Sequence, residues 1–166
     1  HGSKGLTACS RTSKVLPSTR LPRNGHRMSR IIHTDSPGKI RNQLKRTCAE
    51  LLRRLSQKQA VDQETKDMAA YLTLCLRQIE QGIEDSAAVW EKRDYWMKAE
   101  QLRQRWYWVS QAADQIEQVI RRESWAELPE LLARLFAHFV DVRVTRFTRS
   151  ADLWNGAYER FLRSNH

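Results

Sequence analysis

The sequence predicts an all-α protein: an antiparallel bundle of four to five helices with a long central helix, preceded by a basic N-terminal arm. Two observations lead to this prediction. Apolar residues recur every three to four positions from Ile40 onward, which is the period of helices that bury one face. Pro17, Pro22 and Pro37 precede that periodic region, and the chain has only 6 glycines, so turn-rich sheets are disfavoured.

Positive charge is concentrated at the N-terminal end. The formal net charge is +10; residues 1–38 contain seven Lys/Arg and one acid, residues 39–58 again seven and one, and residues 59–166 fifteen and seventeen. This distribution indicates an anionic partner at that end, such as nucleic acid, a membrane surface or an acidic protein. No run of 18 apolar residues is present, so we expect no membrane span.

Residues 1–36 are expected to form a flexible arm. The first three residues look like a tag remnant, and residues 4–34 contain no acid, so they offer too little apolar surface to offset the entropy of ordering. The arm resembles an organelle transit peptide, or is translated upstream sequence with Met28 as the true start, or binds nucleic-acid phosphates. The first two interpretations together are favoured.

The bundle is expected to span residues 37–166, and its first helix to run from about Pro37 to Gln57. Ser36 is a suitable N-cap and Pro37 a suitable first residue. The free N–H groups at this start could hold a phosphate, but an ordinary capped start is favoured. One apolar stripe runs along an otherwise basic helix and is expected to dock on the second helix; its residues are Ile40, Leu44, Cys48, Leu51, Leu52 and Leu55.

Two further helices are predicted between residues 62 and 122. Asp62 is a suitable cap for the second helix, and Gly82 with residues 84–86 indicates a break, although one continuous helix to Arg122 is the alternative. The third helix, roughly residues 86–122, would be about 55 Å long. Its apolar seam alternates four and three residues, as in coiled coils, at Tyr95, Ala99, Leu102, Trp106, Val109, Ala113, Ile116 and Ile120.

The C-terminal third is predicted to fold back on the third helix. Ser124 and Glu127 match a capping box, a fourth helix follows from Pro129 to a break between about 145 and 150, and a last helical segment covers residues 153–162. A tight turn at 124–128 pairs residues whose numbers sum to about 251. That register predicts an aromatic cluster at the far end, with the pairs Trp106 and Phe147, Trp96 and Trp154, and Trp90 and Phe161.

Cysteine and histidine residues give no metal or catalytic signature. Cys9, Cys48 and Cys75 include no CxxC pair, which favours reduced, buried thiols and a reducing compartment such as the cytoplasm. His138 and Asp141 are one helical turn apart, but no Glu-x-x-His pair accompanies them, and a semi-buried core histidine is favoured over a metal ligand. We expect neither a metal nor another cofactor.

The sequence favours a non-enzymatic interaction module. No nucleophile with a neighbouring base, no carboxylate pair and no cofactor motif is present. Because consecutive residues of a helix point about 100° apart, at least one of Trp106, Tyr107 and Trp108 should be exposed, at an interface. The alternative function is a protein–protein scaffold or homodimer. In the first interpretation, the basic arm and the first helix bind nucleic-acid phosphates, and the expected contacts are Arg27, Arg30, Lys39, Arg41, Lys45, Arg46, Arg53 and Arg54.

Overall fold

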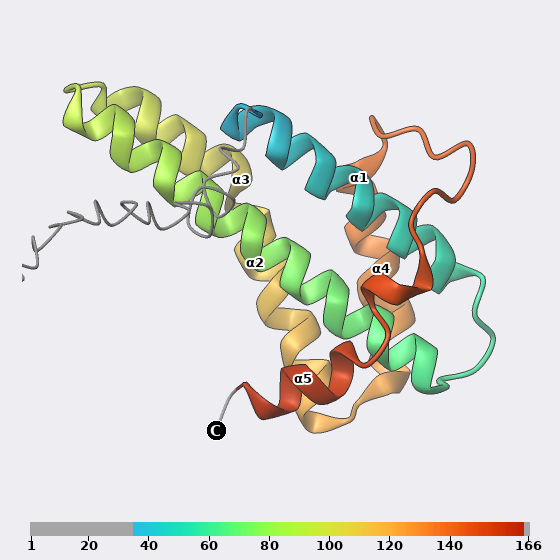
Figure 1. The fold of residues 1–166 in the computed structure, drawn as a ribbon. Coiled ribbons are helices and arrows are strands. Elements are labelled where there is room, and N and C mark those ends of the chain that lie inside the picture. The colour runs from blue at the N-terminus through green and yellow to red at the C-terminus, as the bar shows by residue number, and fades with distance from the viewer. Residues whose placement is uncertain (1–34, 165–166) are drawn as a thin grey trace, which may run out of the picture. The chain divides into compact units, whose positions relative to one another are not determined.

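The computed structural model describes residues 35–164, which form helices and connecting segments without a strand. The all-α prediction is confirmed for this part of the chain (Figure 1). The predicted basic arm, residues 1–36, lies outside the described residues except for its last two. The elements are α1 (Pro37–Ser56), α2 (Gln63–Lys92), α3 (Trp96–Arg122), the 3-10 turn η2 (Trp125–Glu127), α4 (Leu128–Phe136), the 3-10 turns η3 (Ala137–Phe139) and η4 (Ala151–Leu153), and α5 (Ala157–Arg163).

The start of α1 agrees with an ordinary capped helix. The Ser36 hydroxyl accepts a hydrogen bond from the backbone N–H of Lys39 at 3.3 Å, and Pro37 occupies the first turn. The Lys39 ammonium forms an ion pair with Asp35 at 2.8 Å. Local side chains therefore cap this end of the helix, as most helix ends require.

α2 is longer than predicted, because it continues through Gly82 to Lys92. The Asp62 carboxylate caps it by accepting from the Thr65 N–H at 2.8 Å. A glycine inside a helix costs about 1 kcal/mol, but Ile83 and Ala87 extend the buried face of α2 beyond it. Burial of that face outweighs the glycine, so the predicted break at 84–86 was wrong.

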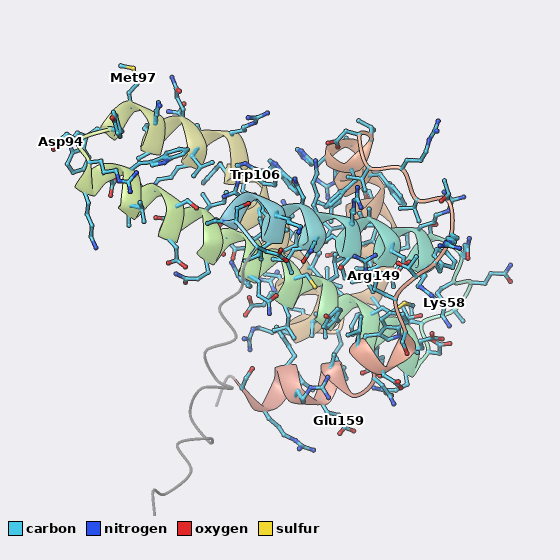
Figure 2. The ribbon with its side chains drawn as sticks, turned by 45° about the horizontal axis from the view of Figure 1, so that its top comes forward. Lys58, Asp94, Met97, Trp106, Arg149 and Glu159 are labelled. Carbon is cyan, nitrogen blue, oxygen red and sulfur yellow. The ribbon has the colours of Figure 1, made fainter. Side chains whose placement is uncertain are left out.

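The true break is the turn at residues 93–95, which joins α2 to α3. Asp94 adopts a left-handed conformation with φ of 62°, and the Tyr95 N–H donates to the Trp90 carbonyl at 2.9 Å. α3 therefore begins at Trp96 and is about 40 Å long rather than 55 Å. Asp94 and Met97 mark the tip of this hairpin, at the opposite end of α2 from α5 (Figures 1 and 2).

α3 lies antiparallel to α2, and most of its predicted seam is buried. Leu102 and Trp106 are half-buried and Tyr95 is exposed. The four-three spacing thus identified the face that packs on α2, apart from the residue at the turn. The buried members are Ala99, Val109, Ala113, Ile116 and Ile120.

α4 ends earlier than predicted. It stops at Phe136, with one 3-10 turn to Phe139, and residues 140–150 form an irregular segment. This segment contains several β-branched residues, which are poor helix formers. The predicted capping box is also absent, because the Ser124 side chain makes no capping hydrogen bond.

The predicted far-end register was wrong. Close to the turn at 124–128 the predicted pairing of α3 with α4 is present, since Ile116 and Leu135 line one pocket between these helices. Beyond Phe139 the chain leaves α3, and α5 packs on α2 instead. Trp154 is therefore buried while Trp96 is 61% exposed, and the expected aromatic cluster does not form.

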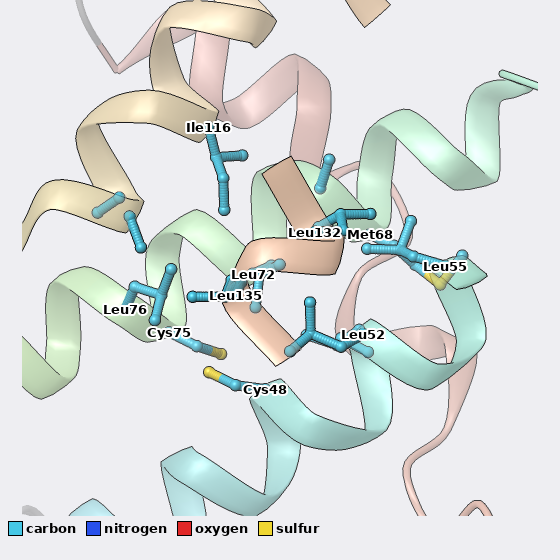
Figure 3. Close-up of a cluster of buried hydrophobic side chains, with 14 of the residues drawn as sticks. Cys48, Leu52, Leu55, Met68, Leu72, Cys75, Leu76, Ile116, Leu132 and Leu135 are labelled. Carbon is cyan, nitrogen blue, oxygen red and sulfur yellow. The ribbon is translucent and has the colours of Figure 1, made fainter. Parts of the chain in front are cut away.

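The core lies where α1, α2, α3 and α4 meet. Figure 3 shows leucines of α1, α2 and α4 converging on Met68 of α2 and Ile116 of α3. Cys48 and Cys75 face each other there as free, buried thiols, as the sequence predicted. A hydrogen bond with Cys75, together with burial, raises the pKa of Cys48, so this thiol is not activated as a nucleophile.

Candidate polyanion-binding surface

Residues 140–150 fold back along α1, and a buried carboxylate of α1 holds them there. Glu50 is only 3% exposed. One of its carboxylate oxygens accepts the backbone N–H of Arg149 at 2.9 Å, and the other accepts the backbone N–H of Thr148. Charge-assisted hydrogen bonds of this kind are stronger than neutral ones. The acid of α1 is thus used to position the C-terminal segment.

Three further hydrogen bonds join residues 144–149 to α1. The Arg53 guanidinium donates to the Val144 carbonyl at 3.0 Å. The Arg149 Nε donates to the Thr47 hydroxyl at 3.2 Å, and the Arg54 guanidinium donates to the Arg149 carbonyl at 3.1 Å. Figure 2 shows Arg149 beside α1.

This packing places the arginines of residues 140–150 beside those of α1. Glu50, with Arg46 one turn before it and Arg53 one turn after it, belongs to one side of the helix. We call the resulting set the arginine face; it consists of Arg46, Arg53, Arg143, Arg146 and Arg149. All except the half-buried Arg149 are exposed.

No carboxylate within residues 35–164 forms an ion pair with the arginine face. Glu50 is buried, and Asp141 pairs with the Lys45 ammonium at 2.9 Å. The hydrogen bond from Lys45 holds the pKa of Asp141 below its usual range. The five arginines therefore outnumber the one buried carboxylate beside them, and the excess of positive charge attracts polyanions.

Only two of the eight arginines and lysines predicted to contact phosphate belong to this face. Arg46 and Arg53 do, whereas Arg27 and Arg30 lie outside the described residues. Lys39 and Lys45 form ion pairs with Asp35 and Asp141, respectively. The structure thus brings part of the predicted set together.

The remaining two predicted contacts, Arg41 and Arg54, are half-buried. The Arg41 guanidinium lies 5.4 Å from the Trp106 ring centroid. That of Arg54 lies between two rings, 4.2 Å from the Phe147 centroid and 5.0 Å from that of Trp154. Both stack on aromatic rings, an arrangement that stabilises the fold.

Sequence reasoning missed Arg143, Arg146 and Arg149. Arg143 was expected on the fourth helix, and Arg146 and Arg149 in the break predicted between about 145 and 150. A sequence signal was available: no acid occurs between Asp141 and Asp152. Nothing in the sequence, however, paired that stretch with Glu50, because the contact is between residues almost a hundred positions apart.

The aromatic run of α3 contains an exposed residue, as predicted. Tyr107 is 63% exposed, and its two tryptophan neighbours are half-buried. Trp108 stacks on His138 with ring centroids 4.2 Å apart. His138 is exposed rather than semi-buried in the core, because α4 unwinds before it. Among the described residues, no cluster of His, Cys, Asp and Glu has the geometry of a metal site.

The comparisons with known proteins give no relative. No family model matches the chain, and no curated protein and no solved structure is similar to it. None of the helices within residues 35–164 combines the length and apolar character that crossing a membrane requires.

Proposed function

We propose that the protein is a non-enzymatic helical module that binds nucleic acid through phosphate contacts of the arginine face. The observation that supports this function is the group of five arginines from two distant segments, without an ion pair in residues 35–164. Guanidinium groups bind phosphate oxygens in a bidentate manner. Contacts of this kind carry no base sequence information.

The test is the salt dependence of binding to a duplex and to a single strand. Replacing Arg46, Arg143 and Arg146 by Gln should weaken binding and reduce the slope of log affinity against log salt. The reduction should be about 0.9 for each duplex phosphate that the variant no longer neutralises. Arg53 and Arg149 are left intact because they bond to Val144 and Thr47 and so help to hold the segment on α1. Fluorescence anisotropy at several salt concentrations measures both quantities.

A matched control removes the same charge elsewhere. Three exposed arginines outside the face, Arg105, Arg122 and Arg134, form no ion pair within the described chain and can be replaced by Gln. The control variant should keep most of the affinity. Equal decreases in both variants would mean that net charge, rather than the arginine face, drives binding.

A second candidate function is protein–protein association, and the tip of the α2–α3 hairpin supports it. Tyr95, Trp96 and Met97 are 52%, 61% and 76% exposed, and aromatic residues and methionine are enriched at interfaces. Most of the predicted seam of α3 is buried in the monomer, so a homodimer would use this tip instead. Sedimentation equilibrium tests the idea: Trp96→Ala should shift a dimer to monomer, and a wild-type monomer at tens of micromolar would exclude homodimerisation at this tip in that range.

A further inference from the structure

An apolar groove separates the first half of α1 from the second half of α2. Its volume is about 400 Å³, within the range of small-ligand pockets. Ile40 and Leu44 line one side, and Ile79 and Val89 line the other. Gly82 leaves the groove open, because a Cβ atom added there would meet nothing within 4 Å.

Arg41 lines the same groove and has no acidic partner within residues 35–164. Its Nε is buried without a hydrogen-bond acceptor, and its contact with the Ser86 hydroxyl is long, at 3.4 Å. Loss of hydration on burial lowers the pKa of Arg41, yet a guanidinium stays charged at neutral pH. A partly desolvated charge without a counter-ion is unfavourable, and an anionic ligand would offset that cost.

The acid on the groove, Asp85, forms no ion pair with Arg41. Asp85 is exposed and accepts a hydrogen bond from the Gln81 amide at 3.0 Å. A second apolar groove, of about 370 Å³ between the end of α1 and α4, differs in this respect. Its lysine, Lys58, forms ion pairs with Asp62 and Glu64. Of the two grooves, the one at Arg41 therefore combines an apolar wall with a cation that, within residues 35–164, contacts an aromatic ring but has no acidic partner.

The size of the groove favours a small molecule over a protein partner. Eleven residues line it, whereas a standard protein interface uses roughly 20–30 residues on each side. A single alkyl chain needs only a narrow apolar channel.

We propose that this groove binds a medium-chain fatty carboxylate. The alkyl chain lies along Ile40, Leu44, Ile79 and Val89, and the carboxylate pairs with the guanidinium of Arg41. This ligand satisfies both features of the groove, and its binding is independent of the arginine face.

The test compares three ten-carbon probes of different head-group charge by isothermal titration calorimetry. Decanoate should bind, decanol should bind more weakly, and decyltrimethylammonium should bind weakest, because only the carboxylate pairs with Arg41. Arg41→Gln should weaken decanoate binding about tenfold or more and leave decanol unchanged. Arg105→Gln, an equal charge change at an exposed arginine of α3 that lines neither the groove nor the arginine face, should leave the binding of all three probes unaffected.

A second variant tests the groove without touching the charge. Gly82→Leu should fold, since the added side chain meets open space and leucine favours helices, and it should abolish decanoate binding by filling the groove. The proposal is overturned if decanoate fails to bind at about 1 mM, if the three probes bind equally, or if a folded Gly82→Leu protein keeps the wild-type affinity for decanoate.

Discussion

Two buried carboxylates hold the C-terminal segment onto the helices. Glu50 of α1 accepts the N–H groups of residues 148 and 149, and Asp67 of α2 accepts those of Gly156 and Tyr158 at 3.2 and 3.0 Å. Both acids are 3% exposed. Buried charges are tolerated when hydrogen bonds satisfy them, and here the bonds connect segments that are distant in sequence.

Removing the Asp67 carboxylate should destabilise the fold. Asp67→Ala leaves two backbone N–H groups at the start of α5 without acceptors, which should lower the free energy of unfolding by about 3 kcal/mol. Urea denaturation followed by circular dichroism measures the change. Asp152→Ala, at an exposed site, should change it by less than about 0.5 kcal/mol. Equal effects of the two variants would contradict the role given to Asp67.

The turn between α2 and α3 contains an avoidable strain at Asp94, whose φ is 62°. A left-handed conformation costs a residue with a side chain about 1 kcal/mol, and glycine avoids that cost. Asp94→Gly should therefore raise the melting temperature by a few degrees. Arg93→Gly, at a neighbouring residue with φ of −100°, should lower it, and a rise in that variant would show that the conformation of Asp94 is not the cause.

At the scale of the element, ion pairs join α2 to α3 along the hairpin. Arg103 of α3 pairs with Glu84 and Glu91 of α2, and Arg77 of α2 pairs with Asp114 and Glu117 of α3. The hydrogen bond from Arg103 lowers the pKa of Glu91. Burial alone would raise the pKa of Glu117, but hydrogen bonds from Arg77 and Arg121 lower this pKa below its usual value.

These lowered pKa values give the hairpin a defined acid sensitivity. A carboxylate with a lowered pKa binds fewer protons in the folded state, so its contribution is complete above the unfolded pKa of about 4.3 and is lost as the pH falls below it. The free energy of unfolding should be nearly constant from about pH 7 to 5 and decrease below about pH 4. Urea titrations at each pH measure this free energy. In the Arg103→Gln variant, the free energy of unfolding should decrease less steeply below pH 4 than in the wild-type protein. If the free energy of unfolding depended on pH in the same way in both proteins, the ion pairs of Arg103 would not be the cause of the acid sensitivity.

The sequence was sufficient for most helices but not for their ends. The spacing of apolar residues and the N-cap side chains correctly predicted α1, the start of α2 and the buried face of α3. Both signals depend only on residues close together in the sequence. Gly82 misled the prediction because the packing of α2 on α3 overrides one unfavourable residue. The early end of α4 was missed for the same kind of reason, since bonds to Glu50 and Arg53 hold residues 144–149 in a non-helical path.

At the scale of the whole molecule, the candidate binding surface depends on contacts that no local pattern encodes. The sequence showed that α1 is basic, and this was sufficient to predict Arg46 and Arg53 as phosphate contacts. The other three arginines of the face come from residues 143–149, and their place beside α1 depends on one buried acid and a few hydrogen bonds. Glu50 therefore fixes this segment on α1 and so assembles the arginine face.

Hydrogen exchange at the Thr148 and Arg149 amides, read residue by residue by NMR, tests that claim most directly. In the wild-type protein both amides should exchange at least about tenfold more slowly than in an unstructured chain, since each donates to a buried carboxylate. In Glu50→Ala this protection should disappear, while α2 amides in the core remain protected. If the two amides of the wild-type protein exchanged as fast as in an unstructured chain, Glu50 would not hold this segment on α1.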